Sequence, residues 1–341
     1  MDHPNRYDGN RIISVGTFLP EDSISSQDLF FEIQSEKQYG IPHDWMCDKM
    51  GIHARRIAAP DLLPSDLAIP AAREALARSN LEPEDIDLLI FCGIERDRPE
   101  PATAHTIQRA LGTKANHVFD VANACYGFAD GVEIANAFIT TNVIRHALIV
   151  TGEIPSRVLL SITERLKRGI PRKEAMKKIG MLSVGDAGGA IVMAPPDCNN
   201  HNGFKAFTKN VDSRHLEKCQ YQACGDGQFD GEMLMQQISA YGFKMHRDII
   251  GTTMKRAGWD RFDWMLSHQP GKKNYEQIAS LDIVDPKKII RVYKQYGNTT
   301  SATFPLSFKK LITSGKVRKG DRIGGCFAGS GLTVGQFCYT Y

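Results

Sequence analysis

Short, almost continuous apolar runs alternate along this chain with longer segments whose apolar residues recur at helical spacing. Runs that are apolar at nearly every position predict strands covered on both faces, and they are Asp87–Gly93, His117–Val121, His146–Gly152, Ala187–Met193, Asp263–His268 and Arg322–Ala328. The helical segments are Ser65–Asn80, Pro101–Leu111, Tyr126–Thr141, Met233–Ala257 and Ser301–Ser314. We expect Ser65 to cap the first helix. The alternation predicts an α/β fold in layers.

The length of the chain predicts two halves. Its 341 residues exceed the roughly 250–300 residues that one hydrophobic core supports. The Gly-rich segments Ser183–Met193 and Phe327–Phe337 resemble each other, and each lies near the end of one half. The polar segment Pro195–Gly203 lies between them. We therefore place an N-terminal half at 1–196 and a C-terminal half at 203–341, with a site at their junction.

Composition and charge exclude several classes of protein. The 42 Lys and Arg against 39 Asp and Glu leave a net charge of +3, too small to indicate nucleic acid as the main partner. No run of about 18 apolar residues predicts a membrane span, and the first residues lack the apolar core of a signal peptide. Eight irregularly spaced cysteines without an export signal are typical of reduced thiols. We expect a cytoplasmic protein.

Motifs for metals and cofactors are weak. His215, Cys219 and Cys224 offer three ligands at an unusual spacing, so chance clustering explains them better than a zinc site. The pairs of glycines at Gly225–Gly227 and Gly329–Gly331 are not followed by the third glycine of a dinucleotide-binding loop. We therefore expect neither a metal nor a cofactor.

One segment is strongly basic. Glu164–Lys178 carries seven basic residues against two acidic ones. It is either a solvated pair of helices or a landing surface for phosphates or for an acidic carrier protein. The sequence leaves these two interpretations equally open.

Cys125 is the thiol with the most informative surroundings. It follows an apolar strand and directly precedes the helix that we expect to start at Tyr126. At the positive end of a helix dipole, backbone N–H groups stabilise a thiolate, and the same groups can hold the oxyanion of a thioester under attack. The alternative is a small buried residue in a tight turn, because an isolated cysteine is more often inert.

Two further polar side chains could assist this thiol. His268 ends a predicted strand, and α/β folds place their sites at the carboxyl ends of strands. Asn298 lies in a loop that enters a helix. Alone, such a histidine is more often structural and such an asparagine is usually a cap or a turn. The order of the sequence does not show that the three residues converge.

Four segments carry a family resemblance, and they are Asp120–Gly127 (DVANACYG), Ser267–Pro270 (SHQP), Tyr296–Ala302 (YGNTTSA) and Ala328–Thr333 (AGSGLT). Together they resemble the thiolase superfamily, and most closely the β-ketoacyl-[acyl-carrier-protein] synthase III type. The segments 45–56 and 184–190 are similar to it as well. The resemblance implies a five-layered αβαβα sandwich, a homodimer, and an acyltransferase that makes C–C bonds by Claisen condensation of acyl thioesters.

The resemblance also implies roles for residues. Cys125 would be the acylated nucleophile, and its backbone N–H would form an oxyanion hole with that of Ser330. His268 and Asn298 would polarise the carbonyl of the second thioester and stabilise its enolate. For this, a neutral His268 has to donate from Nε2.

The substrates that the resemblance implies are thioesters of coenzyme A or of the phosphopantetheine of an acyl carrier protein, with no cofactor. In the family, Trp and Arg clamp the adenine of coenzyme A. Trp45 matches here, whereas Lys49 and Lys273 stand where the family has Arg. Lysine keeps the charge but loses the planar fork of arginine. This favours a donor held by an acyl carrier protein over one held by coenzyme A.

Glu100 bears on the type of condensation. The chain is similar to olefin-pathway enzymes, which condense two acyl chains head to head and have a glutamate at this position. These enzymes share with this chain the sequence of Gly51–Arg56 (GIHARR) and a longer insertion, which here spans about 157–180. A malonyl donor forms its enolate by losing CO₂, but a plain acyl donor needs a base, which Glu100 could be. Alternatively, Glu100 merely favours the positive end of the helix at Pro101.

Three functional hypotheses follow. The chain condenses acyl thioesters with a malonyl-type or a plain acyl donor, it passes its acyl group to an alcohol or amine in a natural-product pathway, or it is a non-catalytic subunit. The presence of Cys125, His268 and Asn298 argues against the third. Acyl length would depend on a tunnel for which the candidates are Phe128, Phe138, Met181 and Met233–Met235.

Overall fold

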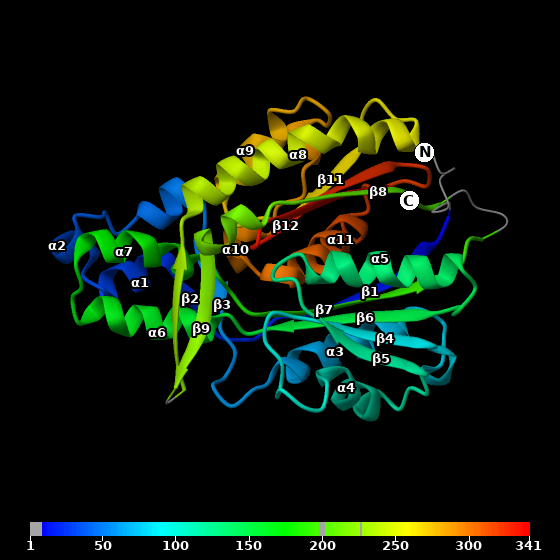
Figure 1. The fold of residues 1–341 in the computed structure, drawn as a ribbon, viewed down its shortest axis with the longest axis horizontal. Helices are drawn as coiled ribbons and strands as arrows, with labels where there is room; N and C mark the ends of the chain where they lie inside the picture. The colour runs from blue at the N-terminus through cyan, green and yellow to red at the C-terminus, as the bar shows by residue number, and fades with distance from the viewer. Residues whose placement is uncertain (1–8, 198–201, 226) are drawn as a thin grey trace.

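The computed structural model describes residues 9–197, 202–225 and 227–341, and these form two main sheets (Figure 1). The first sheet has the order β1-β7-β6-β4-β5, with bounds Arg11–Phe18, Ala187–Ala194, Ala147–Glu153, Leu88–Cys92 and His117–Val121. The strand β4 pairs in parallel with β5 and β6, while β7 is antiparallel to β1 and β6. All of its residues come from the predicted N-terminal half.

The second sheet comes from the predicted C-terminal half. Its order is β11-β12-β13-β8, with bounds Trp264–Ser267, Arg322–Gly329, Thr333–Thr340 and Gly203–Val211. Only β11 and β12 are parallel. The segment 195–203, expected to separate the halves, lies partly outside the described residues.

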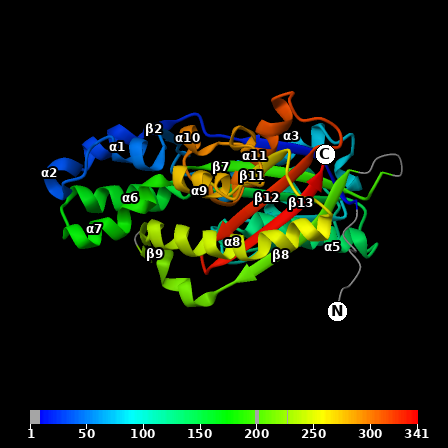
Figure 2. The same cartoon turned by 90° about the horizontal axis from the view of Figure 1, so that it is seen from above.

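Helices form the remaining layers (Figures 1 and 2). The helices α3 (Pro64–Ala77) and α4 (Thr103–Leu111) cover the outer face of the first sheet, and α5 (Gly127–Thr140) and α11 (Thr303–Thr313) lie between the sheets. The helices α8 (Met235–Ala257) and α9 (Lys272–Ala279) cover the second sheet. This is the expected αβαβα sandwich.

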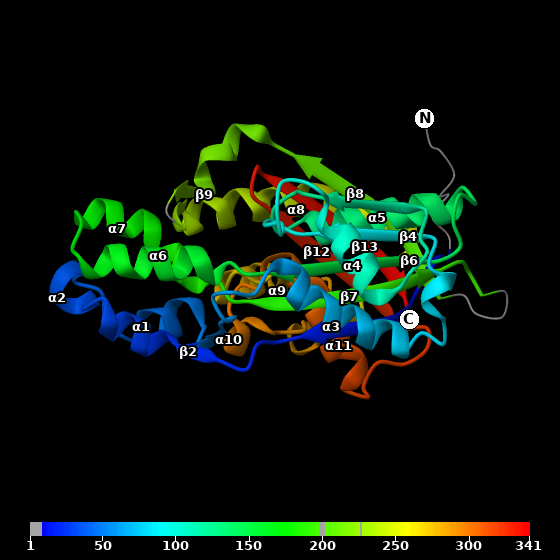
Figure 3. The same cartoon turned by 90° about the horizontal axis from the view of Figure 1, so that it is seen from below.

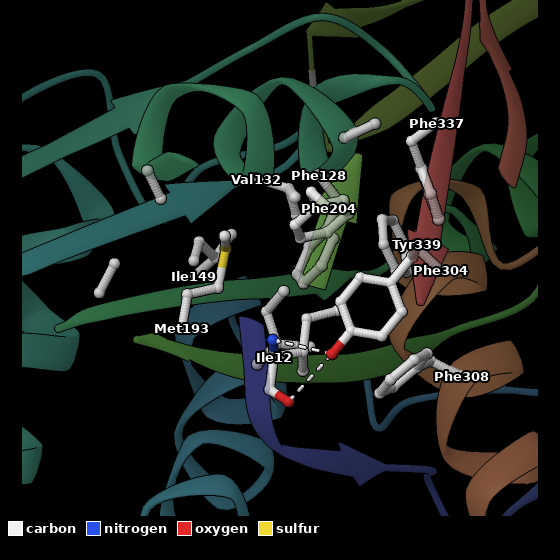
Figure 4. Close-up of a cluster of buried hydrophobic side chains, with 14 of the residues drawn as sticks. Ile12, Phe128, Val132, Ile149, Met193, Phe204, Phe304, Phe308, Phe337 and Tyr339 are labelled. Atoms are coloured by element: carbon white, nitrogen blue, oxygen red, sulfur yellow. Dashed lines mark hydrogen bonds between the residues drawn. The ribbon is translucent and has the colours of Figure 1, made fainter. Parts of the chain in front are cut away.

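The core between the two sheets is aromatic (Figure 4). Phe304 on α11 stacks on Phe327 of β12 at 4.8 Å and on Phe337 of β13 at 5.2 Å between ring centres. The hydroxyl of Tyr339 accepts from the Ile12 N–H at 3.2 Å and lies 3.4 Å from the Ile12 carbonyl oxygen, to which it donates. The contact of Tyr339 with Ile12 joins a strand of the C-terminal half to a strand of the N-terminal half, and the stacked rings fill the space beside it.

A helical lobe extends from one end of the sandwich (Figure 3). It contains α1 (Ser26–Glu32), α2 (Ser35–Tyr39), α6 (Ser156–Lys167) and α7 (Arg172–Lys178), which share a separate apolar cluster. The small strand pairs are β2 (Ser23–Ser25) with β3 (Ala54–Arg56), and β9 (Cys219–Gly225) with β10 (Gln228–Met233). The helix α10 is Tyr293–Tyr296. Within the described residues, no helix is long and apolar enough to cross a membrane.

The predicted N-cap of the first helix is wrong. The helix α3 begins at Pro64, so Ser65 lies inside its first turn, and its N–H donates to Asp97 at 3.0 Å. The residue before the helix, Leu63, donates its N–H to the carboxylate of Asp66 at 2.8 Å. Proline is favoured at the first helical position because the N–H that it lacks needs no partner there. The helix therefore begins at Pro64 rather than after Ser65.

Candidate active site

Cys125, His268 and Asn298 line one cavity at the junction of the two halves. This cavity, pocket A, has about 710 Å³ of empty space, including its opening, and is also lined by residues of α8 and α9. A second space of about 960 Å³, pocket B, is lined by Cys125, Asn298 and Ser330 as well. Its walls are mostly apolar, and they include Ile94, Pro155, Val158, Met181, Val184, Leu216 and Met233. Cys125 therefore lies where the two pockets meet.

Cys125 stands on a tight elbow between strand and helix. The strand β5 ends at Val121 and α5 begins at Gly127, and Ala124 has a left-handed φ of 47°. A non-glycine residue in this region is strained, and such strain concentrates at functional sites. The Gly-rich turn after β12 packs directly on the elbow. A Cβ at Gly329 would lie 2.9 Å from the Asn123 carbonyl oxygen, which leaves room only for glycine there.

The expected thiolate at Cys125 is not supported. Burial raises the pKa of the Cys125 thiol well above its ordinary value, and the nearby Cys219 and Glu153 raise it further. The positive end of the α5 dipole opposes this shift, but the loss of water around a buried anion outweighs it. The shift favours a neutral resting thiol, which would have to lose its proton in any attack on a thioester.

The surroundings of His268 favour its neutral form. The backbone N–H of His268 donates to the Cys326 carbonyl oxygen at 2.9 Å, and this bond continues the pairing of β11 with β12. Burial lowers the pKa of the imidazole to about 4. The ring nitrogen Nδ1 is buried without a hydrogen-bond partner among the described residues.

Asn298 has a fixed carboxamide. The backbone N–H of Asn298 donates to the Ser183 carbonyl oxygen at 2.8 Å, and its backbone carbonyl oxygen accepts from the Gly185 N–H at 3.1 Å. The side-chain Oδ1 accepts from the N–H of Thr300 at 3.0 Å. Because this oxygen faces an N–H, the Nδ2 group is the end of the carboxamide left to donate to a bound carbonyl.

The segments 45–56 and 184–190, which carry part of the family resemblance, support the loop that holds Asn298. A Cβ at Gly185 would lie 2.3 Å from the Tyr296 carbonyl oxygen, so the two loops interlock only through glycine. The buried Arg55 donates to the Leu182 carbonyl oxygen at 2.8 Å. The carboxylate of Asp186 accepts from two N–H groups, those of Ala58 at 2.7 Å and Ser156 at 2.8 Å. Arg55, Gly185 and Asp186 therefore have structural roles.

Glu100 is not brought to the other three residues. It lies exposed on the loop between β4 and α4 and is not among the residues that line pocket A or pocket B. Within one chain, its role as a base has no geometric support.

The residues expected at the entrance lie on two neighbouring elements. Trp45 is half-buried beside the short helical turn Met46–Met50 and stacks on Phe30 at 6.1 Å. Lys49 on this turn and Lys273 on α9 are exposed. The turn contacts α9, and α9 lines pocket A, so the three residues lie near that pocket without lining it.

The basic segment is largely neutralised by its neighbours. Four of its seven cations make ion pairs with acids of the lobe and of β10: Arg165 and Lys178 with Asp230, Lys167 with Glu32 and Glu164, and Lys177 with Glu232. The interpretation as a solvated helix pair therefore gains support over that of a landing surface.

Several residues near the site were missed by sequence reasoning. Glu153 is buried at the end of β6, and burial raises its pKa to about 8. Its carboxyl group accepts from the Ser301 hydroxyl and from the Ile94 N–H at 3.3 Å. Its place at the carboxyl end of a strand is the signal that could have found it.

A tyrosine and a second histidine were missed as well. Tyr221, in the wall of pocket B, donates its hydroxyl to Glu95 at 3.2 Å, and Glu95 pairs with Arg157 at 2.9 Å. His246 on α8 lines pocket A beside His268. No local pattern distinguishes these residues, because only tertiary packing brings them to the pockets.

Of the residues proposed for the acyl tunnel, Met181 and Met233 line pocket B. Phe128 and Phe138 instead belong to the aromatic core between the sheets. An acyl chain in pocket B would thus contact methionines of the lobe side, whose flexible side chains adapt to different shapes.

The chain is similar to known condensing enzymes over nearly its whole length. The model of 3-oxoacyl-[acyl-carrier-protein (ACP)] synthase III matches residues 119–212, and the model of its C-terminal part matches residues 254–341. The β-ketoacyl-[acyl-carrier-protein] synthase III of Geobacillus kaustophilus is 29% identical over 332 residues, covering 96% of this chain and 97% of that protein. The one of Solibacter usitatus is 26% identical, covering 95% and 96%.

Solved structures extend the likeness. Cerulenin-bound OleA of Xanthomonas campestris has a TM-score of 0.92 and 26% identity, and the match covers all of both chains. A cysteine-to-serine variant of OleA with bound lauric acid and lauroyl-CoA has a TM-score of 0.91 and 27% identity, covering 98% of this chain and all of that one.

The fold and the site define a condensing enzyme of the thiolase superfamily, an acyltransferase that joins acyl thioesters by Claisen condensation. Within that superfamily, the chain belongs to the family of 3-oxoacyl-[acyl-carrier-protein] synthase III.

Proposed function

We propose that Cys125 carries an acyl chain that extends into pocket B, and that the second thioester enters pocket A. The observation that carries this proposal is the place of Cys125 at the meeting of an apolar pocket and a pocket lined by His268 and Asn298. An acyl chain is stabilised by apolar walls, whereas a reacting carbonyl needs hydrogen-bond donors.

The first half-reaction acylates the enzyme. The sulfur of Cys125 attacks the thioester carbonyl and forms the new acyl–sulfur bond. The bond to the sulfur of coenzyme A or of the carrier breaks, and this sulfur takes up the proton of Cys125 and departs as a thiol. The backbone N–H groups of Cys125 and Ser330 hold the oxyanion. The close packing of Gly329 on the elbow supports this pairing, because it brings the following residue beside Cys125.

The second half-reaction forms the C–C bond. Neutral His268 donates from Nε2 and Asn298 donates from Nδ2 to the carbonyl oxygen of the second thioester, which stabilises its enolate. The enolate carbon attacks the acyl carbonyl, and the sulfur of Cys125 departs and takes up a proton. The product is a β-ketoacyl thioester.

We propose a malonyl-type donor for this step. Among its described lining residues, pocket A has no charged side chain, and both of its histidines have lowered pKa values. A carboxylate in such a neutral pocket has no partner cation, which favours the loss of CO₂ over retention of the charge. That loss generates the enolate without a base.

Head-to-head condensation of two acyl chains is the second candidate, favoured by the similarity to OleA, whose solved variants replace a cysteine, a histidine or a glutamate. Here Glu100 would be the base, and it would have to reach pocket A of a second copy. We expect a homodimer, with acyl-CoA or an acyl carrier protein as donor.

Intact-protein mass spectrometry over a panel of acyl-CoAs tests the proposal, followed by measurement of CO₂ with malonyl and plain acyl donors. We expect an acyl adduct that is lost in Cys125→Ala, and CO₂ in equal amount to product. Product without CO₂ that also needs Glu100, as shown by loss of activity in Glu100→Gln, would establish the second candidate. An O- or N-acyl product would indicate acyl transfer instead.

A further inference from the structure

Pocket A contains a second histidine that the proposed mechanism does not use. His246 lies on α8 and is 7% exposed, and both His246 and His268 line the pocket. The two imidazoles are close enough to affect each other's charge. The question is what two neutral imidazoles do in one pocket.

The tautomer of His246 is fixed by its neighbours. The side-chain Nε2 of Gln336 lies 2.9 Å from the His246 carbonyl oxygen and 3.2 Å from its Nδ1. A carbonyl oxygen only accepts, so the atom of Gln336 that faces it has to be the amide nitrogen, which only donates. The Gln336 Oε1 in turn accepts from Thr253 at 2.7 Å. His246 Nδ1 is therefore an acceptor, and the proton of this neutral ring is on Nε2.

His268 lacks a hydrogen-bond donor to its Nδ1 among the residues that the structure describes. Its Nδ1 is buried without a partner in the part of the chain that the structure describes. The residue two places on, Pro270, has no N–H to offer it. A buried nitrogen without a partner costs free energy, and for a ring that has to donate from Nε2 this nitrogen has to be an acceptor.

We propose that His246 is a positioning residue for His268. Its Nε2–H donates to Nδ1 of His268 through one bridging water molecule and so keeps the His268 proton on Nε2. This inference rests on the proposed role of His268 as a donor to the second thioester. The polar chain from Thr253 through Gln336 to His246 thus fixes which nitrogen of His268 faces the substrate.

Ser267 is the rival donor. Its hydroxyl is also buried without a partner, and it lines pocket A next to His268. No charged side chain lines the pocket in the described residues, so the donor is one of its neutral polar groups, which also include Asn274 and Gln277.

Nitrogen NMR of protein labelled with ¹⁵N-histidine tests the proposal, because the shifts of Nδ1 and Nε2 distinguish the two neutral tautomers. The signals of His268 are assigned with a His268→Gln variant. We expect Nε2–H on both histidines, and mixed tautomers of His268 in His246→Phe and in Gln336→Leu. His246→Gln, whose amide can still donate, should restore much of the single tautomer, and Ser267→Ala should leave it unchanged.

The kinetic counterpart is a split between half-reactions. Condensation should fall about tenfold in His246→Phe, the loss of one hydrogen bond, while acylation of Cys125, followed by mass spectrometry, falls much less. An unchanged single tautomer in both His246→Phe and Gln336→Leu, or its loss in Ser267→Ala, would overturn the proposal. The NMR result does not depend on turnover, so a failure of the proposed function would show separately as an absent acyl adduct.

Discussion

Cys125 and His268 are both partly buried, and the loss of surrounding water disfavours the charged form of each. It raises the pKa of the thiol and lowers that of the imidazole, so the pair does not exist as a thiolate and an imidazolium. A neutral imidazole can donate a hydrogen bond from Nε2 to the carbonyl oxygen and to the enolate oxygen that forms from it. The same environment that slows the first attack thus prepares the second half-reaction.

The reactivity of Cys125 should therefore rise with pH well past neutrality. Because its pKa in the folded protein is raised, the thiol stays protonated at pH 7 and ionises only as the pH passes above 9. Rates of alkylation by iodoacetamide, followed by intact mass from pH 6 to pH 10, should increase throughout without a plateau. A plateau below pH 7 would show a thiolate stabilised by the helix instead.

Glu153 should make stability depend on pH. Burial raises its pKa from 4.5 to about 8, so between these values the folded protein holds a proton that the unfolded chain has released. Stability from this residue is full below pH 4.5 and is lost as the pH rises towards 8. In urea unfolding from pH 5 to pH 8, Glu153→Gln should show a shallower decline than the natural chain.

Asp186 serves as the internal reference in that series, because burial raises its pKa to about 7 and it remains in both proteins. Equal slopes for Glu153→Gln and the natural chain would show that Glu153 is ionised in the folded protein.

At the scale of elements, the site depends on how closely two turns approach. Gly329→Ala would place a Cβ 2.9 Å from both the Asn123 carbonyl oxygen and the Tyr126 nitrogen, which are backbone atoms and cannot yield easily. We expect a lower free energy of unfolding and a slower acylation of Cys125. Urea unfolding and mass spectrometry measure the two effects.

Gly251→Ala in α8 is the matched control, because no atom lies within 4 Å of the added methyl group. There, alanine should raise the free energy of unfolding by about 0.5–1 kcal/mol. If Gly329→Ala behaved like this control, the elbow and the turn would not be in contact in solution.

The lobe contains a buried cation whose partner can be removed. The amino group of Lys178, on a side chain 3% exposed, lies 2.5 Å from the carboxylate of Asp230 on β10. Asp230→Asn would leave this charge buried without its counter-ion, at a cost of about 3 kcal/mol in the free energy of unfolding. The exposed pair of Lys244 and Asp248 is the comparison, and Asp248→Asn should change stability by less than about 0.5 kcal/mol. Equal effects would contradict the burial of Lys178.

Elements were predictable where burial leaves a local mark. The strands β4, β6 and β7 are covered on both faces and were placed within one or two residues of their bounds. The hairpin of β9 and β10 was missed, because β9 is largely exposed, β10 is mostly half-buried, and the two strands pair only with each other. The strand β8 is buried at its start, becomes more exposed towards its end and contains two lysines, so its sequence lacks a continuous apolar run.

For the whole molecule, the layers and the convergence of Cys125, His268 and Asn298 were predictable from the motif resemblance rather than from spacing. The contributions of His246, Tyr221 and Glu153 were not, because each reaches the site through contacts with residues far away in the sequence. A junction between two halves is built from such contacts, and the site lies at that junction.

The central claim is that Cys125 holds an acyl group and gives it up to a carbon atom. An isolated enzyme whose acyl group is labelled with ¹³C at its carbonyl carbon can be mixed with a malonyl thioester labelled with ¹³C at its methylene carbon. We expect a product with direct coupling between the two labelled carbons and a Cys125 freed of its adduct. Release of the label as a free acid, an ester or an amide, with no coupled carbons, would contradict it.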